Sequence, residues 1–256
     1  TNPLLFFILL CGRIGDMKYT LIFLDTETTG SNETDFLCQV AYKVGGEINC
    51  ELFKPPVKIP PEASAVSHIT NKMVLDKPVF KESLFYGPLK NLLESEDAIL
   101  VAHNAMFDVG MLKKEGIEPT TIIDTMRVAR YVDKEGTIPR YNLQYLRYYL
   151  EIEVDAQAHD AKGDVIVLEE LYKRLFNKIR TDCNSDDEAV ERMVQISSEP
   201  SLIRTFTFGK YKDKKVEEVL KLDRGYLEWL YNQKTEDENR DEDWIYTLKH
   251  YLGILQ

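Results

Sequence analysis

The sequence predicts an α/β fold in which a mixed sheet is flanked by helices, followed by a small second module. Two β-type runs joined by Gly45-Gly46 have the pattern of an antiparallel hairpin. Short apolar runs then alternate with stretches of helical periodicity, as in β-α-β units with parallel strands. Beyond residue 180 the chain turns polar before Leu202, which indicates a linker and a second module.

Three strands and one helix are expected in the first half of the sheet domain. The strands have β-rich apolar composition, and the helix has apolar residues at three- and four-residue spacing. In chain order, the expected elements are strands Lys18–Asp25, Leu37–Val44 and Glu47–Phe53, the break Pro55–Pro61, and helix Phe80–Leu93.

The second half alternates short buried strands with helices, which adds β-α-β units to the mixed sheet. The expected elements are strand Ala98–Ala102, helix Phe107–Lys114, strand Thr121–Asp124 and helices Thr125–Val132, Leu143–Leu150 and Asp160–Ile179. Residues 17–180 then form the main domain, residues 181–201 a linker around a short helix, and residues 202–256 a small C-terminal α+β module.

Composition and charge limit the classes of function. The chain has 256 residues, 44% of them hydrophobic, which excludes disordered and fibrous classes. The formal charge of −11 argues against binding of nucleic acid or membrane by a broad cationic surface, so a polyanionic substrate must be bound locally. The 4 cysteines lie far apart without a C-x-x-C pair, which argues against a disulfide framework or a zinc site and favours a cytoplasmic protein.

The first sixteen residues differ from the rest of the chain. The apolar run Leu4–Cys11 is shorter than the roughly 20 residues needed to span a bilayer. Because the chain opens with Thr1 and Met17 stands directly before a strand-like run, we interpret residues 1–16 as upstream sequence translated ahead of the natural start. An uncleaved signal or anchor and an ordinary N-terminal extension are the alternatives. We expect no membrane association.

Two carboxylates close the first predicted strand. Asp25 and Glu27 are two residues apart, so strand alternation places both on the same side of the sheet. Two like charges held that close need a cation. Taken alone, a D-x-E pair is more often a polar strand end in solvent than a metal site. The further acids downstream decide between these two interpretations.

Two further acids follow the pattern of helix starts. Asp108, in His103-Asn104-Ala105-Met106-Phe107-Asp108, is expected near a helix N-terminus at the edge of the sheet, and Asp164 stands five residues after His159. Each has an ordinary structural interpretation, since acids are favoured in the first turn of a helix and a histidine often caps one. Together with Asp25 and Glu27, however, they supply hard oxygen ligands for two divalent metal ions, Mg²⁺ or Mn²⁺.

These motifs, in this order, resemble a known family. DTETTG, then HNAMFD, then a histidine five residues before an acid are similar to the three motifs of the DEDD 3′–5′ exonuclease superfamily, histidine subgroup, which includes the epsilon proofreading subunit of bacterial DNA polymerase III. The tyrosine subgroup would need a tyrosine at position 160, where this chain has Asp160. The resemblance covers about Lys18 to Ile179 and implies an RNase H-like fold with a five-stranded mixed sheet.

The resemblance also implies roles for individual residues. Asp25, Glu27, Asp108 and Asp164 would hold two metal ions, and His159 would be the general base that accepts the proton of the attacking water. The substrate would be a nucleic acid with a free 3′-hydroxyl end, and 5′-mononucleotides would be released. The terminal nucleotide would contact Thr28, Thr29, His68, Asn104 and Phe107, with His68 and Phe107 able to stack on a base. Phe107 is equally well explained as a core aromatic under the sheet.

The second module resembles the small C-terminal domain of exodeoxyribonuclease X-type proteins. The segments that carry this resemblance are Thr205–Lys212, Val216–Leu220 and Tyr226–Leu230. Basic residues gather beside Tyr211 and predict contacts with a nucleic-acid backbone: Lys210, Lys212, Lys214 and Lys215. The alternative is a solvated turn over a small core of Phe206, Phe208, Tyr226 and Trp229.

The leading hypothesis is therefore a metal-dependent 3′–5′ exonuclease that prefers DNA and acts in repair or proofreading. An exoribonuclease that trims RNA ends is the alternative within the enzyme class, because no residue distinguishes deoxyribose from ribose. A non-catalytic subunit that docks a DNA polymerase is the alternative of another class. The complete set of four acids and His159 argues against it, because an adaptor has no physical need for clustered carboxylates. Association of an active enzyme with a DNA polymerase stays open.

Overall fold

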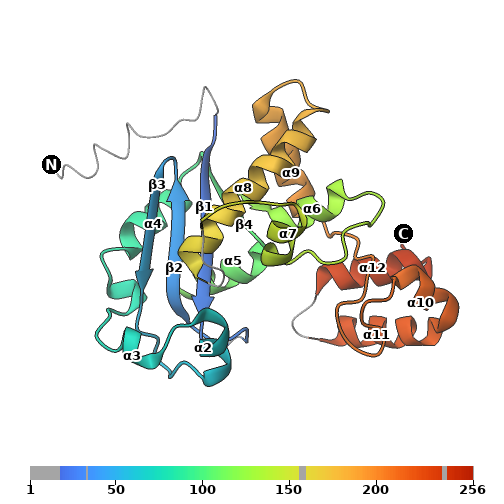
Figure 1. Ribbon diagram of the computed structural model, residues 1–256, viewed down its shortest axis with the longest axis horizontal. Coiled ribbons are helices and arrows are strands. Elements are labelled where there is room, and N and C mark those ends of the chain that lie inside the picture. Colours follow the sequence, from blue (N-terminus) through green and yellow to red (C-terminus); the bar gives the residue numbers. More distant parts are fainter. Residues whose placement is uncertain (1–17, 33, 156–159, 238–240, 256) are drawn as a thin grey trace.

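A computed structural model describes residues 18–32, 34–155, 160–237 and 241–255. A five-stranded sheet has the order β3-β2-β1-β4-β5 (Figure 1). Its strands are β1 (Thr20–Thr28), β2 (Leu37–Val44), β3 (Glu47–Leu52), β4 (Ala98–Ala102) and β5 (Ile122–Asp124). The β1–β2 and β2–β3 pairs are antiparallel, whereas the β1–β4 and β4–β5 pairs are parallel. The expected mixed α/β sheet of five strands is confirmed.

Helices are present at each stretch of expected helical periodicity between Ala105 and Arg180, and α2, α3 and α10 to α12 are additional to the expected helices. Those before β5 are α2 (Pro61–Ser67), α3 (Asn71–Val74), the 3₁₀ helix η1 (Phe80–Glu82), α4 (Tyr86–Leu93) and α5 (Ala105–Lys114). Those after the sheet are α6 (Thr125–Val132), α7 (Leu143–Tyr149), α8 (Ala161–Arg180), α9 (Asp186–Ser198), α10 (Val216–Leu222), α11 (Arg224–Glu236) and α12 (Glu242–Leu252).

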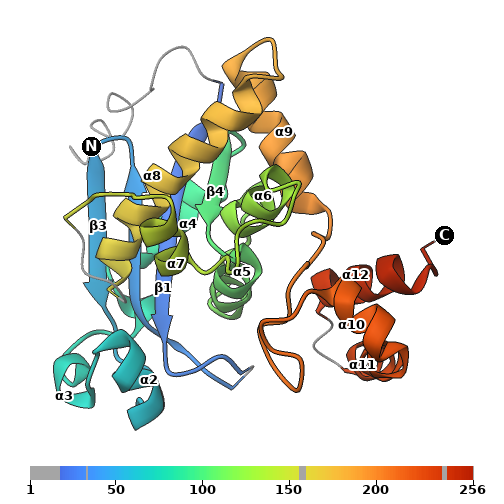
Figure 2. The ribbon, with the colours of Figure 1, turned by 45° about the vertical axis from the view of Figure 1, so that its right-hand side comes forward.

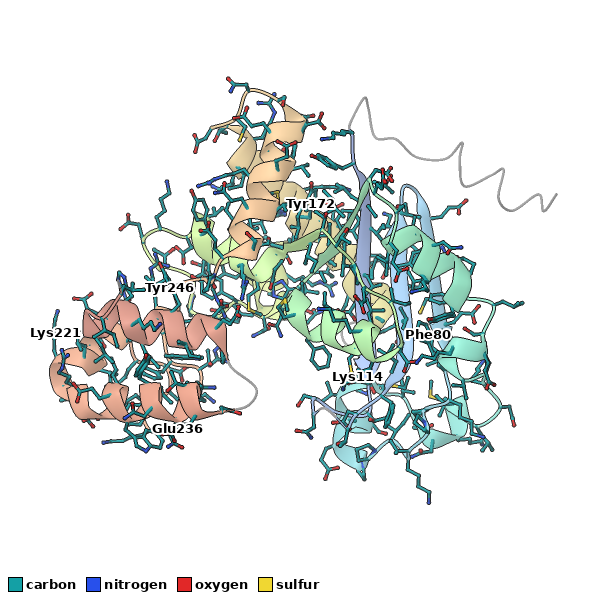
Figure 3. The ribbon with its side chains drawn as sticks, turned by 180° about the vertical axis from the view of Figure 1, so that it is seen from behind. Phe80, Lys114, Tyr172, Lys221, Glu236 and Tyr246 are labelled. Atoms are coloured by element: carbon teal, nitrogen blue, oxygen red, sulfur yellow. The ribbon has the colours of Figure 1, made fainter. Side chains whose placement is uncertain are left out.

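Helices cover both faces of the sheet, and strand alternation divides the core between them. Along β1, Phe23 packs into a cluster with residues of α6, α7, α8 and α9. Its neighbours Ile22 and Leu24 pack on the opposite face, into a cluster with α4 and α5. Tyr172 belongs to the first cluster and Phe80 to the second, and both are labelled in Figure 3. This alternation decides which face each polar side chain at the end of β1 can reach.

The first strand extends beyond the apolar run Lys18–Asp25. Strand β1 continues to Thr28 because β2 keeps pairing with it, opposing Ala41 to Asp25 and Gln39 to Glu27. The hairpin between β2 and β3 turns at Gly45-Gly46 as predicted, with Gly45 at a φ of 57°. Both acids of the D-x-E motif therefore lie within the paired strand.

The prediction of a single helix over Phe80–Leu93 is wrong. Residues 80–82 form η1, Ser83 is extended with φ −79° and ψ 154°, and α4 starts at Tyr86. The Ser83 hydroxyl donates a hydrogen bond of 2.6 Å to the Phe80 carbonyl. A serine that satisfies the backbone in this way competes with the helical hydrogen bond, which periodicity alone does not reveal.

The segment predicted as a linker contains a long packed helix. Helix α9 has 13 residues, and Ser185 caps it by accepting a hydrogen bond from the Glu188 N–H at 3.1 Å. Its apolar face joins the core cluster of α8 through Ala189, Val190, Met193 and Ile196. We therefore propose that α9 belongs with the sheet domain, and that the connection to the second module is the short stretch around Pro200.

The C-terminal module contains α10, α11 and α12, which lie together beside the sheet domain (Figures 1 and 2). Its strand content is one isolated antiparallel bridge, Thr205 to Lys215. The module has a core cluster of its own, with Phe206 fully buried among Val216, Leu227 and Trp244. Phe208 and Trp229 are 37% and 53% exposed, so the small core predicted from four aromatic residues is only partly closed.

Every helix in the part of the chain that the structure describes is too short or too polar to cross a bilayer.

Candidate active site

The end of β1 presents Asp25 and Glu27 on one face of the sheet. Asp25 and Glu27 are two and four residues after Phe23, so they lie on the same face of the strand and face α8. Both side chains are partly buried. The alternation that the sequence predicted for this pair is therefore present. Thr26, which lies between them, points to the opposite face of the sheet and faces α5.

Helix α8 brings Asp164 to the same place. Its first turn is held by Gln39 of β2, whose Oε1 accepts a hydrogen bond from the Ala161 N–H and whose Nε2 donates to Asp160, both at 3.2 Å. One carboxylate oxygen from each of Asp25, Glu27 and Asp164 lies within 4.8 Å of the others. Side chains 139 residues apart in sequence thus form a compact group of oxygen atoms at the end of β1.

Asp108 reaches this region from the other face. It is 3% exposed in the first turn of α5, and one of its oxygens accepts a 2.7 Å hydrogen bond from the Thr26 hydroxyl. It lies outside the group of oxygens within 4.8 Å, but its charge acts on both Asp25 and Glu27. Three of the four predicted acids are therefore in direct proximity, and the fourth is held beside them by Thr26.

Burial and mutual repulsion dominate the electrostatics of Asp25, Glu27 and Asp108. Burial, followed by the charges of Asp108, Asp164 and Glu27, raises the pKa of Asp25 well above its ordinary value. Burial and the charges of Asp164 and Asp108 raise the pKa of Glu27 to about 8, and burial raises that of Asp108 to about 7. Among the described residues, no Lys or Arg forms an ion pair with these three acids. A divalent cation would supply the missing positive charge through the oxygen ligands that Mg²⁺ and Mn²⁺ prefer.

Two glutamines support the site, and the sequence analysis missed both. Gln39 stands opposite Glu27 and holds the start of α8, and its position as a polar residue inside the apolar run of β2 was a usable signal. Gln144 of α7 donates a hydrogen bond from Nε2 to Asp164, while its Oε1 is buried without a hydrogen-bond partner among the described residues. No local signal marks Gln144, because only the packing of α7 on α8 brings it to the site.

The residues around the second motif have structural partners. The carboxylate of Asp124 accepts hydrogen bonds from the Asn104, Ala105 and Met126 N–H groups at 3.0, 3.2 and 2.9 Å. These bonds start α5 at Ala105, two residues before the predicted start, and they hold Asn104 at a φ of 63°. His103 lies between the Thr125 hydroxyl and the Tyr141 carbonyl, at 2.9 and 2.6 Å.

The predicted substrate contacts have different surroundings. His68 is exposed at the C-cap of α2 with a φ of 60°, and Asn104 is exposed before α5. The Thr28 hydroxyl donates to the Gly30 carbonyl at 2.6 Å, and the buried Thr29 hydroxyl donates to Asp35 at 2.9 Å. Phe107 is partly buried against the core cluster of α4 and α5, in keeping with its core interpretation. Their contact with substrate stays a prediction.

The predicted general base, His159, lies outside the described residues. Its role therefore stays a prediction.

The four lysines predicted to contact nucleic acid in the second module have different surroundings. Lys210 forms an ion pair with Asp223 at 3.0 Å and lies over the Tyr211 ring at 4.8 Å. Lys212, Lys214 and Lys215 are exposed, and no described acid forms an ion pair with them. Their contact with a nucleic-acid backbone stays a prediction.

Comparisons with known proteins agree with this geometry. The exonuclease family model matches residues 22–172, and the exodeoxyribonuclease X-like C-terminal model matches residues 206–234. Exodeoxyribonuclease 10 of Escherichia coli is 31% identical over 240 residues, covering 91% of this chain and 98% of that protein. The DNA polymerase III epsilon subunit of Buchnera aphidicola is 36% identical over 149 residues, covering 48% of this chain and 60% of that protein.

A solved structure shares the fold. Exonuclease X in complex with 5′-overhanging duplex DNA superimposes with a TM-score of 0.55 at 26% identity, covering 69% of this chain and 99% of that chain. The first matched model spans the whole sheet and the acids of the site, and the second lies in the small C-terminal module. The chain therefore belongs to the exonuclease family and is an exonuclease related to exodeoxyribonuclease X.

Proposed function

We propose that this exonuclease removes 5′-mononucleotides from the 3′ ends of DNA by metal-dependent hydrolysis. The observation that carries the proposal is the group formed by Asp25, Glu27 and Asp164, whose oxygens lie within 4.8 Å of one another, with Asp108 beside it. Such a group is electrostatically unfavourable unless it binds a cation or retains protons. A phosphodiester hydrolase has a direct use for the cation.

The chain's own residues have separable tasks in this mechanism. Asp25, Glu27, Asp108 and Asp164 would hold two divalent ions, which when bound polarise the scissile phosphate and lower the pKa of a water molecule. Gln144 holds one oxygen of Asp164, and Thr26 holds one oxygen of Asp108, so both acids are fixed in orientation at the site.

His159 would accept the proton of the attacking water. A neutral imidazole with an ordinary pKa of about 6.5 is suited to that role at cellular pH, whereas a carboxylate engaged by a metal ion is not.

DNA is the preferred substrate class because of the relatives. The E. coli relative that covers 91% of this chain is an exodeoxyribonuclease, and the solved structure of exonuclease X contains 5′-overhanging duplex DNA. The similarity to a DNA polymerase III epsilon subunit leaves association with a polymerase as a further proposal. RNA is tested as a competing substrate below.

The test compares matched substrates under one set of conditions. Single-stranded DNA, duplex DNA with a 5′ overhang, and RNA of the same sequence carry a label at the 5′ end, and cleavage is followed with Mg²⁺, with Mn²⁺ and after chelation. A 3′–5′ exonuclease shortens the labelled strand stepwise, whereas the opposite polarity releases the label at once. Asp164→Asn is the inactive control, and Asp76→Asn, which changes an exposed acid outside the site, is the matched active control.

Three outcomes contradict the proposal. Activity that survives exhaustive chelation refutes the metal dependence. Immediate release of the 5′ label refutes the polarity. Faster degradation of RNA than of both DNA substrates refutes the DNA preference and supports an exoribonuclease.

A further inference from the structure

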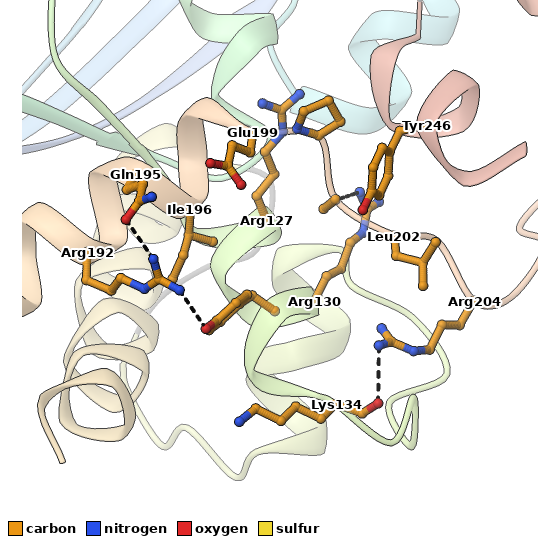
Figure 4. A pocket seen from close by; sticks show the side chains of 13 residues that line it. Arg127, Arg130, Lys134, Arg192, Gln195, Ile196, Glu199, Leu202, Arg204 and Tyr246 are labelled. Carbon is orange, nitrogen blue, oxygen red and sulfur yellow. Dashed lines mark hydrogen bonds between the residues drawn. The ribbon is translucent and has the colours of Figure 1, made fainter. Parts of the chain in front are cut away.

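A basic pocket lies where the C-terminal module meets the sheet domain. Its volume is about 360 Å³, which is within the range of ligand-binding pockets. Figure 4 shows its walls: Arg130 and Lys134 from α6 and the following turn, Arg192 and Glu199 from α9 and its end, and Arg204 and Tyr246 from the C-terminal module. We call this the interface pocket.

Part of its charge is neutralised within the protein. Arg127 and Arg130 both line the pocket, and both form ion pairs with Asp243 of α12, at 3.1 and 2.6 Å. Arg130 also donates to the Ser201 hydroxyl at 2.9 Å. These two arginines attach the module to α6 and are not available as a pair of free cations.

The other three cations form no ion pair with an acid among the described residues. Arg192 is held by neutral groups, the Gln195 Oε1 at 2.6 Å and the Tyr131 hydroxyl at 2.9 Å (Figure 4). Arg204 donates to the Lys134 carbonyl at 3.1 Å, and the Lys134 ammonium lies in the same lining. Glu199 is the one acid in the pocket lining, and its charge acts on Arg192 without forming an ion pair with it. The lining therefore carries a surplus of positive charge in a chain whose net charge is −11.

The chemistry of these groups indicates an anionic ligand with several oxygens. Arginines already held in one orientation lose little freedom on binding, and a guanidinium presents its donors in a fork that matches a phosphate. Tyr246 adds an aromatic side chain to the wall, and basic grooves with aromatic rings are the usual surface for single-stranded nucleic acid.

Asp124 links the support of the active site to a wall of the pocket. Its carboxylate accepts hydrogen bonds from N–H groups at the start of α5, the helix that carries Asp108, and it directly precedes α6. Arg130 of the pocket lining lies five residues along α6, about 8 Å at 1.5 Å per residue. The same segment therefore contributes both to the support of the site and to the pocket.

We propose that the interface pocket binds the phosphodiester backbone of the DNA substrate outside the active site. The proposal rests on the proposed function only for the identity of the ligand. It assigns the site to Arg192, Lys134 and Arg204 at the junction of the two modules, separate from the exposed lysines around Tyr211.

The experiment measures binding without cleavage. Fluorescent single-stranded and duplex DNA are titrated with the full chain in EDTA over a range of salt concentrations, for wild type, Lys134→Gln, Arg192→Gln and the double variant. Each lost phosphate contact should reduce the slope of log K against log[salt] by about 0.7 for single strands and about 0.9 for duplex. In the double variant this slope should therefore be smaller by about 1.4 for single strands and about 1.8 for duplex. Arg192→Lys, which keeps the charge, should recover part of the slope.

Controls separate charge loss from damage to the fold. Lys178→Gln changes an exposed lysine of α8 that forms no ion pair with the described residues, and it should leave the slope unchanged. Thermal unfolding confirms that all variants fold. Hydrolysis of a dinucleotide in Mg²⁺, which is too short to reach the pocket, should proceed at the wild-type rate in every variant.

The outcomes are distinct. A double variant with the same slope and affinity as Lys178→Gln overturns the proposal, even if the enzyme degrades DNA as expected. Binding of inorganic phosphate or a mononucleotide in the pocket, without any effect of the substitutions on DNA affinity, also overturns it in favour of a small-molecule site. Failure of the wild type to hydrolyse any nucleic acid would count against the proposed function, while the measurements in EDTA would still decide the role of the pocket.

Discussion

Two groups of buried charge in this molecule are built in opposite ways. At the end of β1, Asp25, Glu27 and Asp164 gather oxygens within 4.8 Å, and no described Lys or Arg forms an ion pair with the first two. At the module junction, Asp243 is paired with Arg127 and Arg130 and also accepts a hydrogen bond from the Ser201 N–H at 2.9 Å. The junction is paired within the chain, whereas Asp25 and Glu27 form no ion pair with a described Lys or Arg, as the proposed binding of a divalent cation requires. Substitutions should therefore abolish function at the first group and loosen structure at the second.

The largest effect is expected from the acid group itself. Asp25→Asn should lower turnover by at least about 10³-fold, the scale on which loss of one transition-state-stabilising group is felt, because it removes a ligand oxygen from the site. In EDTA the same variant should unfold at a higher temperature than wild type, because it relieves repulsion with Asp108, Asp164 and Glu27. Lower stability of Asp25→Asn in EDTA would show that the acids are compensated by groups of the chain.

The general base should have the next largest effect. His159→Ala is expected to lower kcat by roughly 10²- to 10⁴-fold, the usual contribution of a general base. Affinity for DNA in EDTA should stay near that of wild type. The wild-type rate should rise with pH as the histidine loses its proton, and the variant should lose that dependence. An unchanged pH profile in His159→Ala would remove the residue from the mechanism.

Breaking the compensated group should cost stability and leave the chemistry intact. Asp243→Asn leaves Arg130 without its acid and Arg127 with only its longer ion pair to Glu242 at 3.7 Å. It should destabilise module docking by about 2–3 kcal/mol, less than for a fully buried pair because Arg130 and Asp243 are each 15% exposed. Asp213→Asn breaks the exposed ion pair with Arg140 across the same junction and should cost at most about 1 kcal/mol. Limited proteolysis near Pro200 reports the difference. Equal protection of both variants would show that ion pairs do not hold the junction.

Gln144 tests how the acid group is positioned. Gln144→Leu removes the hydrogen bond to Asp164 and should lower activity about 10- to 100-fold at low Mg²⁺, with recovery as Mg²⁺ rises. The matched control is Gln233→Leu on the exposed side of α11. Loss of activity that no concentration of Mg²⁺ restores would place Gln144 in the reaction and not in positioning.

The pH dependence of stability in EDTA should reflect the raised pKa of Glu27. The folded protein raises the pKa of Glu27 from its ordinary 4.5 to about 8, so it favours the protonated acid. Its contribution to the free energy of unfolding is therefore fully present below pH 4.5 and is lost as pH rises to 8. Glu27→Gln should flatten this decline, and Mg²⁺ should stabilise wild type more at pH 8 than at lower pH. A decline equally steep in Glu27→Gln would assign it to other groups.

The sequence by itself determined the order of the sheet elements and the shared face of Asp25 and Glu27, because hydrophobic period and strand alternation are local properties. It also marked Asp108 and Asp164 as helix-start acids. The structure brought three of these acids together, placed Asp108 behind Thr26, and left His159 outside the residues it describes.

Other features were decided only by contacts between distant segments. Gln144 acts at the site because α7 packs on α8, and α9 joined the core despite a polar sequence at its start because its apolar face meets α8. The ion pairs of Asp243 and the unpaired cations of the interface pocket depend on how one module lies on the other. Charge pairing and docking depend on distances between side chains that are far apart in sequence. Patterns of neighbouring residues along the chain do not specify these distances.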